Sequence, residues 1–204
     1  MLRITLALIA LSTLHACGSR QAVQPIPPGE DAYPTVLTPV SELGGDFAMQ
    51  QEVTMVHPEG ENTFSAVLQK QGDTLTMMAL GPHGGRAFML VQRGTEVEYE
   101  SFISIEFPFP PQYILHDIHR AWFARVDQAA AEGERIEEER VDGHVMGRTF
   151  ERVGEEERGQ IRVSYEGGLD DGAPVSARPP EHATLENGWF GYTARIHTRE
   201  WQAL

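Results

Sequence analysis

The chain has 204 residues, of which 41% are hydrophobic, and its 16 basic and 30 acidic side chains give a formal net charge of −14. This length and composition suit a single domain with its own core, together with tails. The negative charge argues against nucleic acid as a partner, because nucleic acid attracts basic surfaces. The single cysteine excludes an internal disulfide and a thiolate metal site.

The first segment has the features of a bacterial lipoprotein signal. A basic residue precedes an apolar run over residues 4–14, which is too short to span a bilayer. The run ends in "LHAC", which resembles the lipobox, although His15 replaces its usual small residue. We expect a signal peptide over residues 1–16 and a lipid anchor on Cys17. Gly18 favours the outer membrane, where the protein would face the periplasm. The alternative is an ordinary secretory peptide, or a short buried helix, with an incidental cysteine.

Residues 17–42 are rich in proline and poor in large apolar side chains. Proline favours extended backbone, so this segment is predicted to be a semi-rigid tether. It would hold the globular part, residues 43–204, away from the membrane. In the alternative, the segment packs on the domain through Tyr33, Val36 and Leu37.

From about residue 47 the hydrophobic residues recur with period two, which is typical of β-strands. Tight connections at "QGD" and "GPHGG" indicate hairpins. The acidic stretch "ERIEEERV" is predicted to be a solvated edge strand or a loop. The apolar positions that alternate are Met49, Val53, Met55, Phe64, Ala66, Leu68, Leu75, Met77, Ala79, Val97, Tyr99, Val145, Phe150, Ile161, Val163, Tyr165, Ala183, Leu185, Phe190, Tyr192, Ala194 and Ile196. Nine or ten antiparallel strands are expected.

One segment changes to helical periodicity. Pro110 and Pro111 can open a helix, after which Ile114, Ile118, Ala121 and Trp122 recur at helical spacing. The helix is expected to pack on the sheet, and an Ala- and Glu-rich stretch after residue 126 can extend it. The predicted fold is therefore mainly β with one or two helices: a strongly curved antiparallel sheet, or open half-barrel, covered by a helix.

Candidate catalytic and metal-ligating groups carry little signal. His116 and His119 lie three residues apart on the predicted helix, but no third ligand or glutamate base stands at the spacing of a helical zinc site. They are interpreted as structural or surface histidines. No Gly-x-Ser-x-Gly elbow and no phosphate-binding loop occur, and runs such as "EEE" are usually solvated. Five further histidines show no pattern, namely His57, His83, His144, His182 and His197. We expect no enzyme activity, no catalytic residue, no metal site and no cofactor.

Apolar surface remains as the feature that can bind something. "LTMMAL" and "AFMLV" are hydrophobic on both strand parities, so both faces of these strands need cover. Methionine adapts to irregular ligands, although plain core filling is an equal alternative. The candidate ligand-binding residues are Leu68, Leu75, Met77, Met89, Tyr99 and Trp122.

Two stretches resemble a known family. "LTMMALGPHGGRAF" is similar to the central hairpin of an uncharacterised bacterial lipoprotein family, a domain of unknown function often encoded beside aryl-polyene biosynthesis genes. "ATLENGWFGYTARIHT" is similar to its closing strand, with Asn187, Gly191 and Tyr192 in matching places. The family more distantly resembles LolA and LolB, the outer-membrane lipoprotein carrier and receptor, which implies a half-barrel that holds acyl chains. An acidic insertion over residues 132–139 and a loop over residues 167–180 depart from this pattern.

The leading hypothesis is a non-enzymatic envelope lipoprotein that binds an acyl or polyene-like hydrophobic group in lipid or lipoprotein transport or assembly at the outer membrane. Its partners would be that hydrophobic ligand and, through the lipid anchor, the membrane. The alternative is an envelope scaffold whose acidic edge, Glu137 to Glu139 and Glu155 to Glu157, docks a protein partner. An envelope hydrolase would need the fold to bring His116 or His119 beside a serine.

Overall fold

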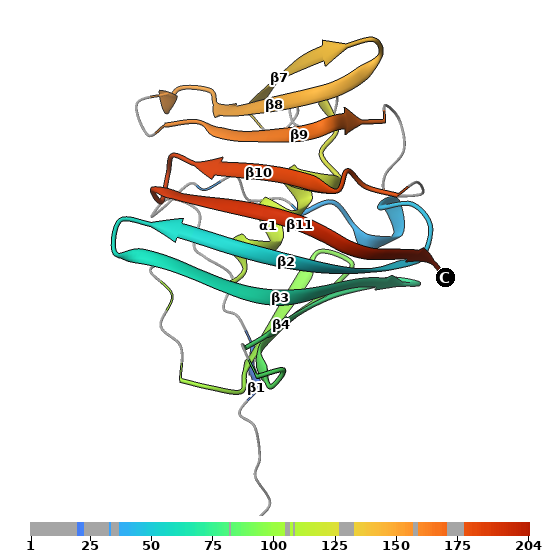
Figure 1. Ribbon diagram of the computed structural model, residues 1–204, viewed down its shortest axis with the longest axis vertical. Coiled ribbons are helices and arrows are strands. Elements are labelled where there is room, and N and C mark those ends of the chain that lie inside the picture. The colour runs from blue at the N-terminus through green and yellow to red at the C-terminus, as the bar shows by residue number, and fades with distance from the viewer. Residues whose placement is uncertain are drawn as a thin grey trace, which may run out of the picture.

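The computed structural model describes residues 20–22, 33, 37–81, 83–104, 107, 109–126, 133–156, 159–170 and 178–204. These residues form an eleven-stranded sheet with α1 against one face (Figure 1). The predicted signal peptide, Cys17, Val36 and the predicted helical extension over residues 127–132 lie outside the described residues.

The strands follow the period-two segments of the sequence. In chain order they are β1 (Arg20–Ala22), β2 (Phe47–His57), β3 (Gly60–Gln71), β4 (Thr74–Leu80), β5 (Arg86–Arg93), β6 (Glu96–Ser101), β7 (Glu134–Val141), β8 (His144–Arg152), β9 (Ile161–Leu169), β10 (His182–Asn187) and β11 (Tyr192–Ala203). The helix α1 spans Tyr113–Trp122, and a short 3-10 helix, η1, spans Val40–Glu42.

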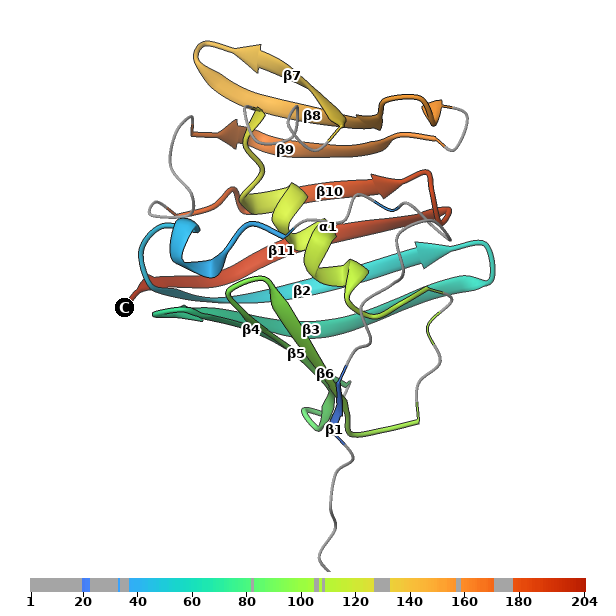
Figure 2. The same cartoon turned by 180° about the vertical axis from the view of Figure 1, so that it is seen from behind.

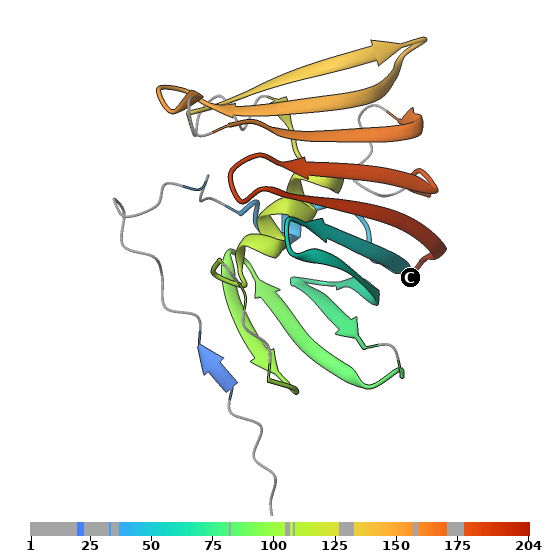
Figure 3. The same cartoon turned by 60° about the vertical axis from the view of Figure 1, so that its left-hand side comes forward.

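The sheet consists of two antiparallel meanders joined in the middle. Its strand order is β1-β6-β5-β4-β3-β2-β11-β10-β9-β8-β7, so the last strand of the chain pairs with β2. All neighbouring strands are antiparallel. Figure 3 shows the sheet curling around α1, with β1 and β7 at its two unpaired edges. The predicted open, strongly curved antiparallel sheet under a helix is confirmed.

The two faces of the sheet differ in burial. We call the face covered by α1 the inner face; α1 lies across it in Figure 2. On β4, Leu75, Met77 and Ala79 point to this face and are at most 4% exposed, whereas the residues between them are half-buried. Because successive side chains of a strand alternate in direction, this pattern places the core between the sheet and α1.

The N-terminal part of the described chain is in contact with the domain. Arg20–Ala22 forms β1 against β6, which is a strand that the sequence did not predict. Tyr33 is 0% exposed and Leu37 is 4% exposed. These two residues therefore pack on the domain, as the alternative prediction for this segment expected. The unpaired backbone groups of an edge strand favour such an addition, because they otherwise bind only water.

The helix begins where the two prolines predicted. The amide nitrogens of Tyr113 and Ile114 donate to the carbonyl oxygens of Pro110 and Pro111, at 3.0 and 3.1 Å. Leu115, Ala121 and Trp122 are buried, but Ile114 and Ile118 are only half-buried. The helix also buries its polar residues His116, Asp117, His119 and Arg120. Its sheet contact is therefore partly polar, whereas the helical spacing in the sequence had marked only apolar positions. Within the described residues no helix has the length and hydropathy to cross a membrane.

Candidate functional site

Four of the predicted ligand-binding residues share the inner face. Leu68 pairs with Met77, Met77 pairs with Leu90, and Leu90 pairs with Tyr99, so that a row of large apolar side chains crosses four strands. Leu75 lies on the same face of β4. Leu68 and Met77 are 1% and 4% exposed, whereas Tyr99 is half-buried. We call Leu68, Met77, Leu90 and Tyr99 the inner row.

The other two predicted residues lie elsewhere. Met89 pairs with Met78, and its side chain points away from that of Leu90. It therefore lies half-buried on the outer face, the side of the sheet opposite α1. Because β5 is apolar on both parities, the sequence alone did not separate its two faces. Trp122 is buried at the end of α1, with its ring 6.2 Å from that of Tyr165 on β9. The structure therefore does not bring Met89 and Trp122 into the inner row.

One accessible part of the inner face was not predicted as a site. Val53, Met55, Phe64 and Ile196 are half-buried hydrophobic residues packed against the core, and we call them the tip patch. Their register places them side by side: Val53 pairs with both Phe64 and Ile196. The alternation of β2 and β3 contained this signal, but only the folded structure shows that these side chains stay partly open while Leu68 and Met77 are covered.

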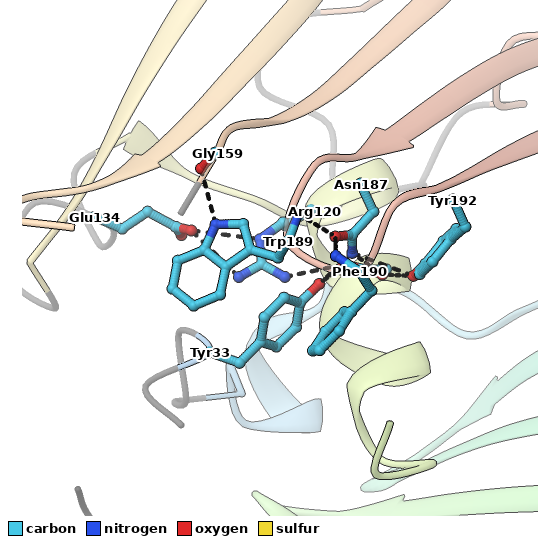
Figure 4. Close-up of polar contacts among 9 residues, drawn as sticks. Tyr33, Arg120, Glu134, Gly159, Asn187, Trp189, Phe190 and Tyr192 are labelled. Carbon is cyan, nitrogen blue, oxygen red and sulfur yellow. Dashed lines mark hydrogen bonds and ion pairs between the residues drawn. The ribbon is translucent and has the colours of Figure 1, made fainter. Parts of the chain in front are cut away.

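A buried polar cluster attaches α1 to the sheet. We call Tyr33, Asp117, Arg120, Glu134, Asn187 and Tyr192 the anchor cluster (Figure 4). The Asp117 carboxylate accepts hydrogen bonds from the hydroxyls of Tyr33 and Tyr192. It also accepts from Asn187 Nδ2 at 3.1 Å and forms an ion pair with an Arg120 terminal nitrogen at 3.0 Å. One carboxylate thus joins the helix to the N-terminal segment, β10 and β11.

Arg120 extends the anchor cluster to the edge of the sheet. Its guanidinium lies 3.2 Å from a carboxylate oxygen of Glu134 on β7 and stacks over the Tyr33 ring at 4.6 Å. Paired, hydrogen-bonded charges are tolerated inside a protein, whereas one left alone is costly. Loss of one member would therefore leave a buried charge or donor with fewer partners.

The motif shared with the resembled family supplies two members of the anchor cluster. The Asn187 side-chain oxygen accepts the amides of Trp189 and Phe190 at 3.0 and 3.1 Å, which shapes the turn between β10 and β11. Its Nδ2 donates to Asp117 and to the Tyr33 hydroxyl. Trp189 Nε1 donates to the Gly159 carbonyl at 2.9 Å (Figure 4). The motif thus builds a turn and presents Asn187 and Tyr192 to the helix.

The electrostatics of the anchor cluster keep its donors protonated. Burial, followed by the nearby Asp117 charge, raises the pKa of Tyr33 and Tyr192 well above the ordinary tyrosine value. Burial opposes the charge of Arg120, but the carboxylates of Glu134 and Asp117 raise its pKa. Both tyrosines therefore remain hydrogen-bond donors, and Arg120 remains a cation.

Two further polar contacts hold the second half of α1. The Nε2 atom of His119 lies 2.8 Å from the side-chain oxygen of Gln92 on β5, and the Tyr165 hydroxyl donates to the Ala121 carbonyl at 2.6 Å. Burial, and then the Arg120 charge, lower the pKa of His119 to about 3. Burial likewise lowers the pKa of His116 well below its usual value. Both histidines are therefore neutral and structural. Of the two interpretations from the sequence, structural or surface histidines, the first is the one that holds.

The predicted acidic edge is present, but arginines interrupt it. β7 is the last strand of the sheet, which confirms the edge-strand interpretation of its sequence. Glu138 is paired with Arg140 and, at 2.9 Å, with Arg148, so its charge is largely neutralised. Glu137 and Glu139 are exposed. Glu157 lies outside the described residues.

The sequence matches a family model described as "Protein of unknown function (DUF3261)" over residues 48–200, which is more than half of the chain. No curated protein matches it. A LolA superfamily protein from Nitrosomonas europaea has a similar structure, with a TM-score of 0.48 and 10% identity over 81% of this chain and 90% of that one.

Two further solved structures are similar. A Vibrio parahaemolyticus domain, described as an outer membrane lipoprotein-sorting protein, gives a TM-score of 0.45 and 8% identity over 78% of this chain and 85% of its own. A DUF1329 family protein from Desulfovibrio piger gives a TM-score of 0.38 and 10% identity over 80% of this chain and 88% of its own. The expected resemblance to an uncharacterised family is confirmed by the family match. The chain belongs to the DUF3261 family of proteins of unknown function.

Proposed function

We propose that this protein is a non-enzymatic envelope lipoprotein that binds an acyl or polyene-like hydrophobic group between α1 and the inner face. Lipid attached to Cys17 would anchor it in the outer membrane, facing the periplasm, where it takes part in lipid or lipoprotein transport or assembly. The anchor is supported by the lipobox-like sequence that ends the apolar run. Residues in contact with the ligand would include Leu68, Leu75, Met77 and Tyr99.

The observation that carries the proposal is the continuous apolar surface of an unclosed sheet. The inner row crosses β3, β4, β5 and β6 without a charged side chain, and α1 covers that face together with the segment around η1. A sheet closed on itself would leave a hydrophobic chain no route between its strands and the helix. Here, movement of α1 away from the sheet would expose part of that surface.

Among the described residues, solvent reaches the tip patch and the half-buried Tyr99 without any movement. A hydrophobic chain would first contact the protein at such positions, since its gain comes from apolar area removed from water. Around Tyr99 the rings of Phe88 and Phe107 lie 6.2 and 6.1 Å away, which widens the apolar contact.

The free energy gained by burying an acyl chain is comparable to the cost of moving the helix. Breaking a buried ion pair costs about 3–5 kcal/mol. Burying one CH₂ group contributes about 0.8 kcal/mol. A chain of about four to six methylenes therefore offsets the loss of the Asp117 and Arg120 contacts.

The test is to find the hydrophobic ligand. The Cys17→Ala chain, purified from the envelope, is extracted with organic solvent, and bound lipid is identified by mass spectrometry. Phe64→Asp places a charge in the tip patch and should lower the bound lipid. The matched control is Thr63→Asp, because Thr63 is the exposed neighbour on β3 and points to the other face. Absence of bound lipid, together with absence of saturable uptake of a fluorescent fatty acid, would contradict the proposal.

A further inference from the structure

The outer face of the sheet carries a cluster of metal-binding side chains that the sequence did not bring together. His182 on β10 is directly opposite His197 on β11, and their ring centroids are 4.3 Å apart. Glu181 precedes His182 in the chain. One ligand atom of each of the three residues lies within 4.8 Å of those of the other two.

The separations are close to those that a metal ion requires. Glu181 Oε1 lies 3.2 Å from His197 Nε2 and 3.8 Å from His182 Nε2. Zinc binds imidazole nitrogen and carboxylate oxygen at about 2.0–2.2 Å, so ligand atoms in a tetrahedral site lie about 3.3 Å apart. Only small side-chain rotations are needed to bring the three ligands onto one ion.

The two strands that carry the histidines are each paired with a neighbouring strand on both sides. β10 lies between β9 and β11, and β11 lies between β10 and β2, so neither strand is an edge. The backbone amide of Thr198 donates to the Glu181 carbonyl at 2.8 Å, which continues the pairing to the residue that supplies the carboxylate. Such a framework fixes where the ligands start, which lowers the cost of assembling the site.

The neighbouring charges leave Glu181 available for a cation. Glu52 on β2 faces His197 across the sheet, but its carboxylate is held by Arg199 at 3.0 Å. Glu181, His182 and His197 have side-chain exposures of 62%, 47% and 24%, so an ion reaches them directly from solvent. The cluster lies on the face opposite α1, and an ion there would not contact the inner row.

We propose that His182, His197 and Glu181 form a binding site for a divalent transition-metal ion, with zinc as the ion that fits best. Two imidazoles and one carboxylate suit zinc and its neighbours rather than calcium or magnesium, which prefer oxygen ligands alone. Three protein ligands leave the fourth tetrahedral position to water. The site is independent of the proposed lipid binding, because it uses the other face of the sheet.

The test is titration of the full chain, purified in detergent without a polyhistidine tag, with zinc chloride in a calorimeter. One zinc ion per chain is expected. His182→Gln and His197→Gln should each weaken binding at least about tenfold, the loss that even outer partners of metal ligands cause. His144→Gln is the matched control, because His144 also lies beside a carboxylate, Asp170 at 2.9 Å, but in a two-residue pair. It should leave the affinity unchanged.

A measurement on the wild-type chain does not depend on whether the variants fold correctly. In NMR spectra of the imidazole rings, zinc should shift the signals of His182 and His197 and leave those of His57 in place. The proposal is overturned if wild type shows no saturable zinc binding, if the double variant His182→Gln/His197→Gln binds as tightly as wild type, or if the stoichiometry is one ion per two chains. Lipid content measured in the same preparations reports separately on the proposed function.

Discussion

Tyr192 on β11 and Asp117 on α1 are joined by a buried hydrogen bond, although 75 positions separate them in the chain. The tyrosine comes from the turn motif that resembles the family's closing strand, and the aspartate lies between two histidines on the helix. The motif is thus connected to the element that covers the inner face. This contact adds to the buried Leu115, Ala121 and Trp122 in holding the helix on the sheet.

Removal of the Asp117 carboxylate should destabilise the protein strongly. Asp117→Ala leaves Arg120 and two tyrosine hydroxyls with fewer partners in the interior, and a loss of about 3–5 kcal/mol in the free energy of unfolding is expected. Urea denaturation measures it. Glu166→Ala, on the exposed side of β9, should change stability by no more than about 0.5 kcal/mol. Equal losses in the two variants would show that the anchor cluster has no special role.

The hydrogen bond between Tyr192 and Asp117 should appear as a coupling energy. Tyr192→Phe removes only the hydroxyl and should cost about 1–3 kcal/mol. In a double-mutant cycle with Asp117→Asn, a coupling of about 0.5–3 kcal/mol is expected, because both side chains belong to one network. Additive effects of the two changes would contradict direct contact in solution.

Mild acid should destabilise the folded chain through the buried histidines. In the unfolded chain histidine titrates near 6.5, whereas the pKa of His119 in the folded chain is about 3. Between these values the unfolded state binds more protons, so stability is complete above about pH 6.5 and falls toward pH 3, by about 1.4 kcal/mol per pH unit for each such histidine.

The measurement is the urea midpoint between pH 7.5 and pH 5, in wild type and in His119→Gln. The glutamine can still donate to Gln92 but does not titrate, so this variant should lose part of the dependence on pH. An identical slope in the two proteins would rule out His119 as a source of the effect.

Gly188 should not tolerate a side chain, for a steric reason. A Cβ atom at this position would lie 2.6 Å from the backbone oxygen of Gln160, which accepts a hydrogen bond from the Gly188 amide. Gly188→Ala should therefore push β9 away from the turn, at a cost of about 1–3 kcal/mol. The control is Gly45→Ala, where nothing lies within 4 Å of the new atom. Thermal denaturation of both variants checks the prediction, and similar melting temperatures would contradict it.

Lipidation at Cys17 is tested in cells. Radioactive palmitate should label the wild-type protein and the Ser19→Ala control, but not Cys17→Ala. The thiol is the acceptor of the lipid, and alanine has none. Label retained by Cys17→Ala would exclude this anchor, while leaving the binding of a hydrophobic group to the inner face untouched.

Local periodicity determined most of the secondary structure. The alternation of Tyr192, Ala194 and Ile196 predicted β11, and the proline pair before Tyr113 predicted where the helix begins. Such signals depend only on neighbours in sequence, because strand and helix geometry repeat over two and 3.6 residues. The curved, open form also followed, from the number of strands and the resemblance to a known family.

Long-range pairing decided the sites. The sequence could not assign Met77 and Met89 to different faces, because both lie in strands that are apolar on both parities. An aspartate in a helix is usually exposed, so Asp117 became recognisable only beside Tyr33, Asn187 and Tyr192. His182 and His197 looked unrelated, yet the turn that pairs Asn187 with Tyr192 also places them opposite each other. Each of these contacts joins residues distant in the chain, and only the register and curvature of the folded sheet bring them together.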